Sequence, residues 1–147
     1  MKVDFNEDGH GSAVLLIHST VAGNKQWRKL IEYLSPHYQV IAPNLFGYGS
    51  SPKWSKKRDQ TLSDHVDLLK GFFERNESIS IVGHSFGGSV AMMAAKEYPE
   101  KIEKLVLIEP NPFYLLKNHS DPGSYQEVLN IRDIIKANAF KETWGQA

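Results

Sequence analysis

The stretch Gly83-His84-Ser85-Phe86-Gly87-Gly88 constrains the fold of this 147-residue chain more than any other. Its serine stands between two glycines and follows a short apolar run that includes Ile79 and Ile81. An alanine- and methionine-rich segment with helical character comes next, and Pro99 ends it. We therefore predict a strand that turns sharply into a helix, with Ser85 at the turn.

The spacing of the two glycines has a chemical interpretation. A serine whose hydroxyl projects above a sheet sits at a strained φ, so the residues two before and two after it must lack bulky side chains. Gly83 and Gly87 meet this requirement, which makes Ser85 a candidate nucleophile at a nucleophile elbow. The alternative is a turn in which Ser85 only caps the next helix. A phosphate-binding loop is weakly supported, because the stretch lacks the Lys-Ser/Thr ending of a P-loop and the full dinucleotide fingerprint.

Short apolar strands alternate with helical segments along the chain. We predict strands over residues 3–5, 13–17, 38–42, 79–82 and 105–108. We predict helices over residues 24–34, 61–73, 89–98 and 124–139, with caps at Asn24, at Thr61 with Asp64, and at Ser124 with Glu127. This alternation indicates an α/β fold, with a mostly parallel sheet and helices on both faces. Ligands bind at the carboxyl ends of such strands, where the sequence places His18-Ser19-Thr20, Ser85 and Glu109.

Composition limits the classes of function. The 41% hydrophobic content suits one globular domain, and Lys plus Arg balance Asp plus Glu at 17 each. No overall positive field favours nucleic acid or an anionic membrane, and we interpret the basic cluster of residues 53–58 as a solvated loop. The absence of cysteine excludes disulfides and thiolate metal sites, and no apolar run approaches the roughly 18 residues of a membrane span. We expect a cytoplasmic protein with no cofactor, metal, membrane span or nucleic-acid partner.

Three segments together resemble the serine hydrolase branch of the α/β-hydrolase superfamily. They are residues 15–20 (LLIHST), 42–51 (APNLFGYGSS) and 83–88 (GHSFGG), and their order and spacing match. The resemblance covers residues 1 to about 110. It implies Ser85 as nucleophile, with an oxyanion hole formed by the backbone N–H of Phe86 and that of Thr20, or alternatively Ser19. It also implies an esterase-like enzyme for a small-molecule acyl substrate such as a carboxylic ester or thioester, an amide, or an activated C–C bond.

The chain departs from the family's pattern in three ways. The family usually has His-Gly where this chain has His18-Ser19, so a side chain could narrow the approach to the oxyanion site. It usually has Asp at Asn44, so a negative charge near the site mouth is lost. The family's triad also ends in a late His, in domains of roughly 200 to 250 residues. We therefore expect a fold truncated after about the sixth strand, with residues 1–110 as core and 111–147 as the start of a helical lid.

None of the histidines fits the role of the catalytic base by its place in the sequence. We expect His84 to point away from the Ser85 hydroxyl, and His18 to order the loop before Thr20. The others fall on a turn, a connection, a helix and the start of the lid: His10, His37, His65 and His119. We expect little or no turnover, since losing the base costs about 8 to 9 kcal/mol of barrier in a well-studied serine protease.

The last predicted strand, residues 105–108, raises two expectations. Glu109 at its end is a candidate triad acid, and the alternative is that Glu109 lines the pocket or caps the next turn. Truncation would leave the strand with an open edge, unless the helix over 124–139 covers it. The alternative function is therefore a non-catalytic binding or assembly module, which pairs with a partner chain or with itself through this edge.

Overall fold

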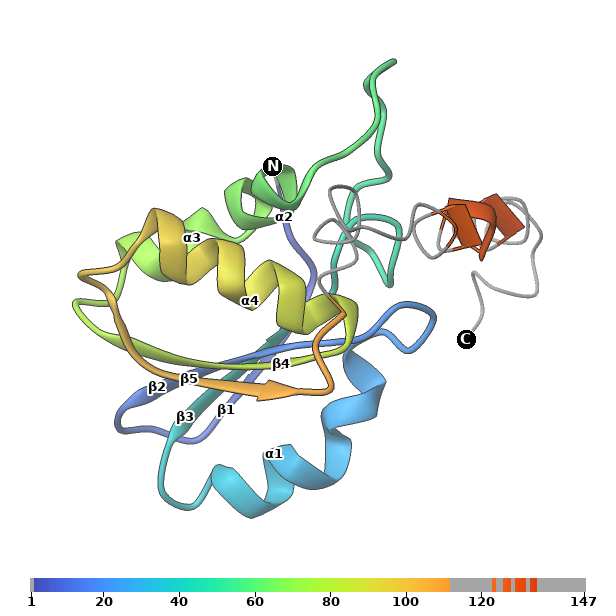
Figure 1. Cartoon of the computed structure of the whole chain (residues 1–147). Helices are drawn as coiled ribbons and strands as arrows, with labels where there is room; N and C mark the ends of the chain where they lie inside the picture. Colours follow the sequence, from blue (N-terminus) through green and yellow to red (C-terminus); the bar gives the residue numbers. More distant parts are fainter. Residues whose placement is uncertain (1, 112–122, 124–125, 128, 132, 135–147) are drawn as a thin grey trace.

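A computed structural model describes residues 2–111, 123, 126–127, 129–131 and 133–134. In this part of the chain, five strands form one sheet with helices on both faces (Figure 1). The strands are β1 (Phe5–Asp8), β2 (Ala13–Ile17), β3 (Gln39–Pro43), β4 (Ile79–His84) and β5 (Ile102–Ile108). The helices of residues 2–111 are the 3-10 helix η1 (Asn24–Trp27) and the α-helices α1 (Arg28–Leu34), α2 (Leu62–Leu68), α3 (Lys70–Glu74) and α4 (Phe86–Glu97).

The sheet has the order β1-β3-β2-β4-β5. Strand β1 is antiparallel to β3, and the pairs β2 with β3, β2 with β4 and β4 with β5 are parallel, which confirms the mostly parallel sheet. From β2 the chain moves outward to β3 and then returns to the other side of β2 as β4. The carboxyl ends of β2 and β4 therefore flank a topological switch point, where open α/β sheets bind their ligands.

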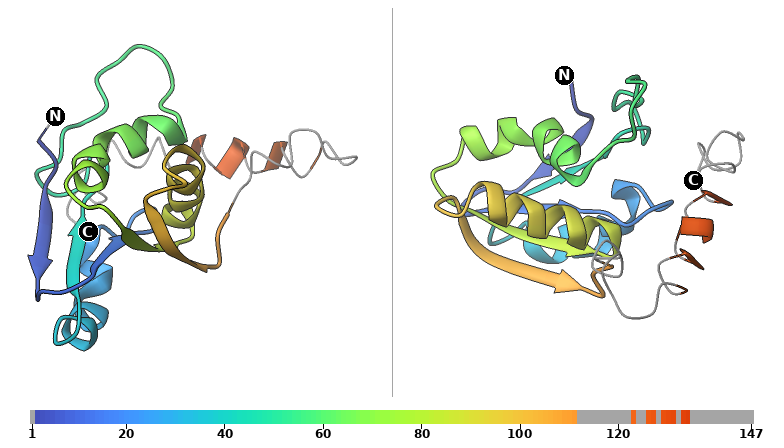
Figure 2. Two further views of the ribbon diagram at one scale, coloured as in Figure 1. Left: turned by 90° about the vertical axis from the view of Figure 1, so that its left-hand side faces the viewer. Right: turned by 45° about the horizontal axis from the view of Figure 1, so that its top comes forward.

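Helices lie on both faces of the sheet (Figure 2), and each face buries its own hydrophobic core. Strand β2 is buried along its whole length. Leu15 and Ile17 pack in the core under α2, α3 and α4, whereas Val14 and Leu16 pack with Trp27 on the side of α1. A strand covered on both faces has no position for a polar side chain, which explains its continuous apolar run.

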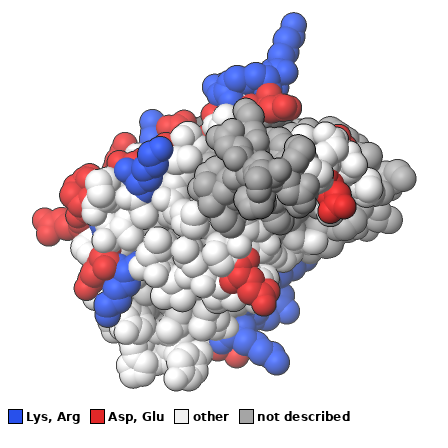
Figure 3. Space-filling view, viewed as in Figure 1, with Lys and Arg blue, Asp and Glu red and all other residues white. Residues whose placement is uncertain are grey.

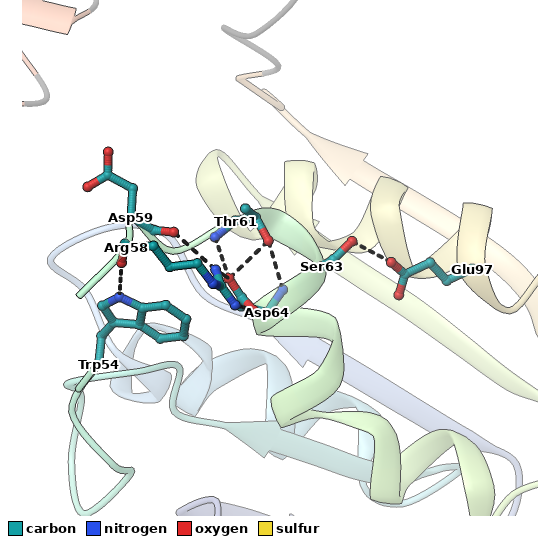
Figure 4. Close-up of polar contacts among 7 residues, drawn as sticks. All are labelled: Trp54, Arg58, Asp59, Thr61, Ser63, Asp64 and Glu97. Carbon is teal, nitrogen blue, oxygen red and sulfur yellow. Dashed lines mark hydrogen bonds and ion pairs between the residues drawn. The ribbon is translucent and has the colours of Figure 1, made fainter. Parts of the chain in front are cut away.

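Helix α2 begins with the predicted capping box (Figure 4). The Asp64 N–H donates to Thr61 Oγ1 at 3.3 Å, and the Thr61 N–H donates to the Asp64 carboxylate at 2.7 Å. Arg58 donates to both oxygens of this carboxylate and holds the pKa of Asp64 well below its usual range. Ser63 links α2 to α4 through a hydrogen bond to Glu97. The end of the loop between β3 and α2 is thereby fixed.

The boundaries of several elements differ from the sequence prediction: residues 24–34 form η1 followed by α1, and β5 begins at Ile102 rather than at residue 105. The first strand covers Phe5–Asp8 rather than residues 3–5, because its register is set by pairing with β3. The helix predicted over residues 61–73 is divided into α2 and α3 at Leu69, whose φ of −94° and ψ of 0° interrupt the helical geometry. Element type was predictable here, whereas the boundaries depend on tertiary contacts.

Charged side chains of both signs are scattered over the face seen in Figure 3. Lys and Arg side chains gather over the loop between β3 and α2, in which Lys53, Lys56, Lys57 and Arg58 are all exposed. Arg58 and Lys56 lie over the Trp54 ring, at 5.0 and 5.9 Å from its centroid. The basic side chains of residues 53–58 are exposed, as predicted.

Residues 123, 126–127, 129–131 and 133–134 are helical. The predicted cap at Ser124 lies outside the described residues, so it stays a prediction, as does the division of the chain at residue 110. Within the described residues, no helix is long and apolar enough to cross a membrane. That part of the chain also holds no group of three or more His, Asp or Glu residues that could bind a metal ion.

Candidate active site

Ser85 lies at a sharp turn between β4 and α4, as predicted. Its φ of 54° and ψ of −117° place a residue with a side chain in a strained backbone region. Its N–H donates to the Ile108 carbonyl at 3.0 Å, which ties the turn to the end of β5. Ser85 is the N-cap residue of α4, but its side chain forms no capping hydrogen bond. The alternative prediction, in which the Ser85 side chain caps the helix, is therefore wrong.

The two glycines of the motif leave no room for a side chain. A Cβ on Gly83 would lie 2.4 Å from the Gly87 carbonyl oxygen, and a Cβ on Gly87 would lie 2.1 Å from the Ile17 carbonyl oxygen. The first close approach lets α4 start directly over the end of β4, and the second brings α4 against the end of β2. The requirement for glycine at both positions is confirmed.

Residues 18–23, which we call the β2 loop, carry the second group of predicted site residues. The Ser19 N–H donates to Gln26 Oε1 at 2.7 Å, and the Val21 N–H donates to the Tyr48 hydroxyl at 2.7 Å. Val21 has a φ of 67°, which is strained for a β-branched residue. Among the described residues, none accepts a hydrogen bond from the Thr20 N–H. Of the two predicted alternatives, the Ser19 N–H is therefore already occupied, and the role of the Thr20 N–H as an oxyanion donor stays a prediction.

His18 orders the β2 loop, in agreement with the sequence analysis. Its Nδ1 donates to the Ser19 carbonyl at 2.8 Å, and its Nε2 accepts from the Leu45 N–H at 3.0 Å. Tyr48 packs edge-on against the ring, with centroids 4.5 Å apart. Burial lowers the pKa of His18 to about 4 and raises that of Tyr48. Both ring nitrogens of His18 are thus engaged in holding the loop.

None of the described histidines forms a hydrogen bond with Ser85. The His84 ring is bonded to Gln26, with 2.8 Å between its Nδ1 and Gln26 Nε2. His65 is buried on α2 between the rings of Phe46 and Phe86, and burial lowers its pKa to about 4. His10 and His37 precede the amino ends of β2 and β3. They therefore lie at the opposite end of the sheet from Ser85. His119 lies outside the described residues.

Glu109 directly follows β5 and is exposed, with a φ of 45°. The hydrogen bond from Ser85 to Ile108 brings this strand end next to the elbow. Strands β2, β4 and β5 are parallel, so their carboxyl ends lie at the same end of the sheet. These strand ends are followed by Thr20, Ser85 and Glu109. No described histidine is hydrogen-bonded to Glu109, so its role as triad acid stays a prediction.

Asn44 belongs to a polar network beside the β2 loop. Its Oδ1 accepts from the Asn24 N–H at 2.8 Å, and its Nδ2 donates to Asp4 Oδ2 at 2.9 Å. Asp4 Oδ2 also accepts from the Ser50 N–H at 3.0 Å. The negative charge missing at Asn44 is thus present on Asp4, a residue that the sequence analysis overlooked. The Asn24 side chain donates to the Ala42 carbonyl instead of capping a helix, so its predicted capping role is wrong.

We expect Asn44→Asp to lower the free energy of unfolding by about 1 to 3 kcal/mol at pH 7, because a second carboxylate would replace the donor that faces Asp4. Urea denaturation followed by tryptophan fluorescence measures the loss. The double variant Asp4→Asn/Asn44→Asp should recover part of it, since an amide again faces a carboxylate. A single variant as stable as the wild type, or purely additive losses in the double variant, would contradict this pairing.

The fold agrees with a comparison against known families. A family model described as "alpha/beta hydrolase fold" matches residues 12–137. The chain therefore belongs to the α/β-hydrolase fold family, as its three motifs predicted.

Similar proteins in this family have different activities. A cis-3-alkyl-4-alkyloxetan-2-one decarboxylase from Shewanella oneidensis is 30% identical over 118 residues, and lipase LipV from Mycobacterium tuberculosis is 33% identical over 116 residues. These alignments cover 78% and 75% of this chain, but 37% and 43% of the relatives. The solved structure of a thermophilic esterase from Thermogutta terrifontis has a TM-score of 0.69 and 29% identity, covering 74% of this chain and 40% of that one. The chain spans less than half the length of these three proteins.

Proposed function

We propose that this protein is a serine hydrolase that acts on a small-molecule acyl substrate, with Ser85 as its nucleophile. The geometry of the elbow carries this function. A serine at positive φ, between a strand and a helix and without a capping bond, is the arrangement that exposes a hydroxyl above an α/β sheet. Similarity to a lipase and to an esterase supports carboxylic esters, thioesters or related compounds as substrates.

Phe86 and Thr20 supply the oxyanion hole in this proposal. Phe86 is the first residue of α4, where the backbone N–H has no intrahelical partner and the helix dipole favours negative charge. Thr20 follows the neighbouring strand β2, and the close approach of Gly87 to Ile17 brings the start of α4 against that strand end. Two N–H donors from separate elements can then stabilise the oxygen that becomes negative when a serine attacks a carbonyl.

We infer that the described residues lack a general base for Ser85. His18 uses both ring nitrogens within the β2 loop and beside it, and His84 is bonded to Gln26. His65 is enclosed by aromatic rings. A serine hydroxyl without a base stays protonated at neutral pH, so turnover by these residues alone is slow.

Labelling with a fluorophosphonate probe tests this function. We expect slow labelling confined to Ser85, located by peptide mass spectrometry, absent in Ser85→Ala and accelerated by added imidazole, which supplies a base. Ser78→Ala is the matched control, because Ser78 is exposed and precedes the amino end of β4, far along the strand from the elbow. Equal labelling of Ser85→Ala, or no labelling of the wild type even with imidazole, would refute the role of Ser85.

A second candidate function is an assembly module, which the exposure of β5 favours. Within the described residues β5 is an edge strand, and its Leu105, Val106 and Ile108 are between 38% and 49% exposed. Apolar edge strands with unpaired backbone groups pair readily with other chains. Size-exclusion chromatography with light scattering should then show at least the dimer mass, reduced to the monomer mass by Val106→Lys. A stable wild-type monomer with ordinary thermal unfolding would count against this function.

A further inference from the structure

Gln26 joins the β2 loop to the elbow through its side-chain amide. Its Oε1 accepts from the Ser19 N–H at 2.7 Å and from the Ser19 hydroxyl at 3.0 Å. Its Nε2 lies 2.8 Å from His84 Nδ1. Ser19 directly precedes Thr20, and His84 directly precedes Ser85. One amide therefore spans the gap between the neighbours of the proposed oxyanion donor and of the proposed nucleophile.

The hydrogen-bond polarity of this bridge is determined by the backbone. Because the Ser19 N–H can only donate, the amide atom that faces it must be the oxygen. The amide nitrogen then donates to His84 Nδ1, which must carry a lone pair. The His84 ring is therefore held as the tautomer with its proton on Nε2. An amide flip would face donor with donor at Ser19.

The bridge also occupies one of the two N–H groups that flank Thr20 in the β2 loop. Side chains occupy the N–H groups on both sides of Thr20, since Gln26 accepts from Ser19 and Tyr48 accepts from Val21. Only the N–H of Thr20 lies between them without a partner among the described residues. The Ser19 hydroxyl, at the position where the family usually has glycine, is bonded to Gln26 as well.

We propose that Gln26 is a positioning residue, which fixes the Thr20 N–H relative to Ser85 by bonding Ser19 to His84. Because Gln26 acts through Thr20 and Ser85, its role rests on the proposed function of these two residues. Gln26 itself is exposed, so its replacement removes hydrogen bonds without opening the core. Its loss should therefore reduce reactivity more than stability.

Fluorophosphonate labelling in the presence of imidazole tests this role in three variants. Gln26→Met has similar length and no amide, and it should lower the rate constant for Ser85 labelling about tenfold, less than the roughly hundred- to thousandfold loss when an oxyanion donor is removed. Gln26→Glu keeps the acceptor for Ser19 and should retain an intermediate rate. Lys25→Met, an exposed neighbour on η1, should label at the wild-type rate. Lys25→Met should keep the wild-type urea midpoint, and the two Gln26 variants should lower it only slightly, because an exposed hydrogen bond contributes little net stability.

Nuclear magnetic resonance provides a readout that needs no reactivity. In the wild type, the ¹⁵N shifts of His84 should identify the Nε2–H tautomer, and Gln26→Met should move both these shifts and the Thr20 amide resonance. If the wild type labels but Gln26→Met labels equally fast, Gln26 has no positioning role while the proposed function stands. If no protein labels, the proposed function fails, and an unchanged Thr20 amide resonance in Gln26→Met would separately refute the positioning role.

Discussion

Gly87→Ala is expected to lower the free energy of unfolding by about 3 kcal/mol or more, because the added methyl group would overlap backbone atoms. Its Cβ would lie 2.1 Å from the Ile17 oxygen and 2.5 Å from the His18 oxygen, both of them backbone atoms. A side chain could rotate away, but these carbonyls belong to the end of β2 and to the β2 loop. Helix α4 must therefore move off the sheet, which costs at least as much as other overpacked cores. Urea denaturation followed by tryptophan fluorescence measures the loss.

Two other glycines separate steric overlap from backbone strain. Gly71 in α3 has no atom within 4 Å of an added Cβ and no positive φ, so Gly71→Ala should stabilise the fold by about 0.4 to 1 kcal/mol. Gly47 also has open space, but its φ is +82°, and Gly47→Ala should cost about 1 to 2 kcal/mol from strain alone. A Gly87→Ala loss no greater than that of Gly47→Ala would show that β2 and α4 can separate at little cost.

Local backbone chemistry made the elbow and the central strand predictable. Only glycine fits where two backbone segments are in contact. The two glycines around Ser85, Gly83 and Gly87, therefore predict a close approach of backbone segments from the sequence alone. The unbroken apolar run of β2 likewise required cover on both faces. The capping box at Thr61 was predictable because its two partners are three residues apart.

Long-range polar pairs in the site could not be predicted in this way. Gln26 is bonded to Ser19, 7 residues away, and to His84, 58 residues away, and no periodicity marks an exposed glutamine for such a role. Asp4 and Asn44 are 40 residues apart. Tyr48 lies within a recognisable segment, yet its bond to the Val21 N–H depends on how two loops meet in space. These contacts follow from strand order, which the sequence pattern does not specify.

Lowering the pH from about 6.5 toward 4 is expected to destabilise the fold strongly, because two buried histidines are kept neutral. Burial lowers the pKa values of His18 and His65 from 6.5 to about 4. The unfolded chain then binds more protons than the folded chain within this window, so stability rises with pH. Each histidine contributes fully above about pH 6.5 and loses about 1.4 kcal/mol by pH 5.5. Asp64, whose pKa Arg58 holds low, stays ionised throughout the window.

His65→Leu separates the two histidines and tests the assignment. No described group is hydrogen-bonded to His65 Nδ1, so replacing His65 leaves no hydrogen-bond partner of this atom unpaired. Replacing His18 would leave the Leu45 N–H unpaired. We expect the difference in unfolding free energy between pH 7 and pH 5.5 to be about halved in His65→Leu, and unchanged in the exposed control His10→Gln. Urea titrations at both pH values measure it. If the wild type is equally stable at both, or if His65→Leu keeps the full difference, His65 is not the neutral group that burial requires it to be.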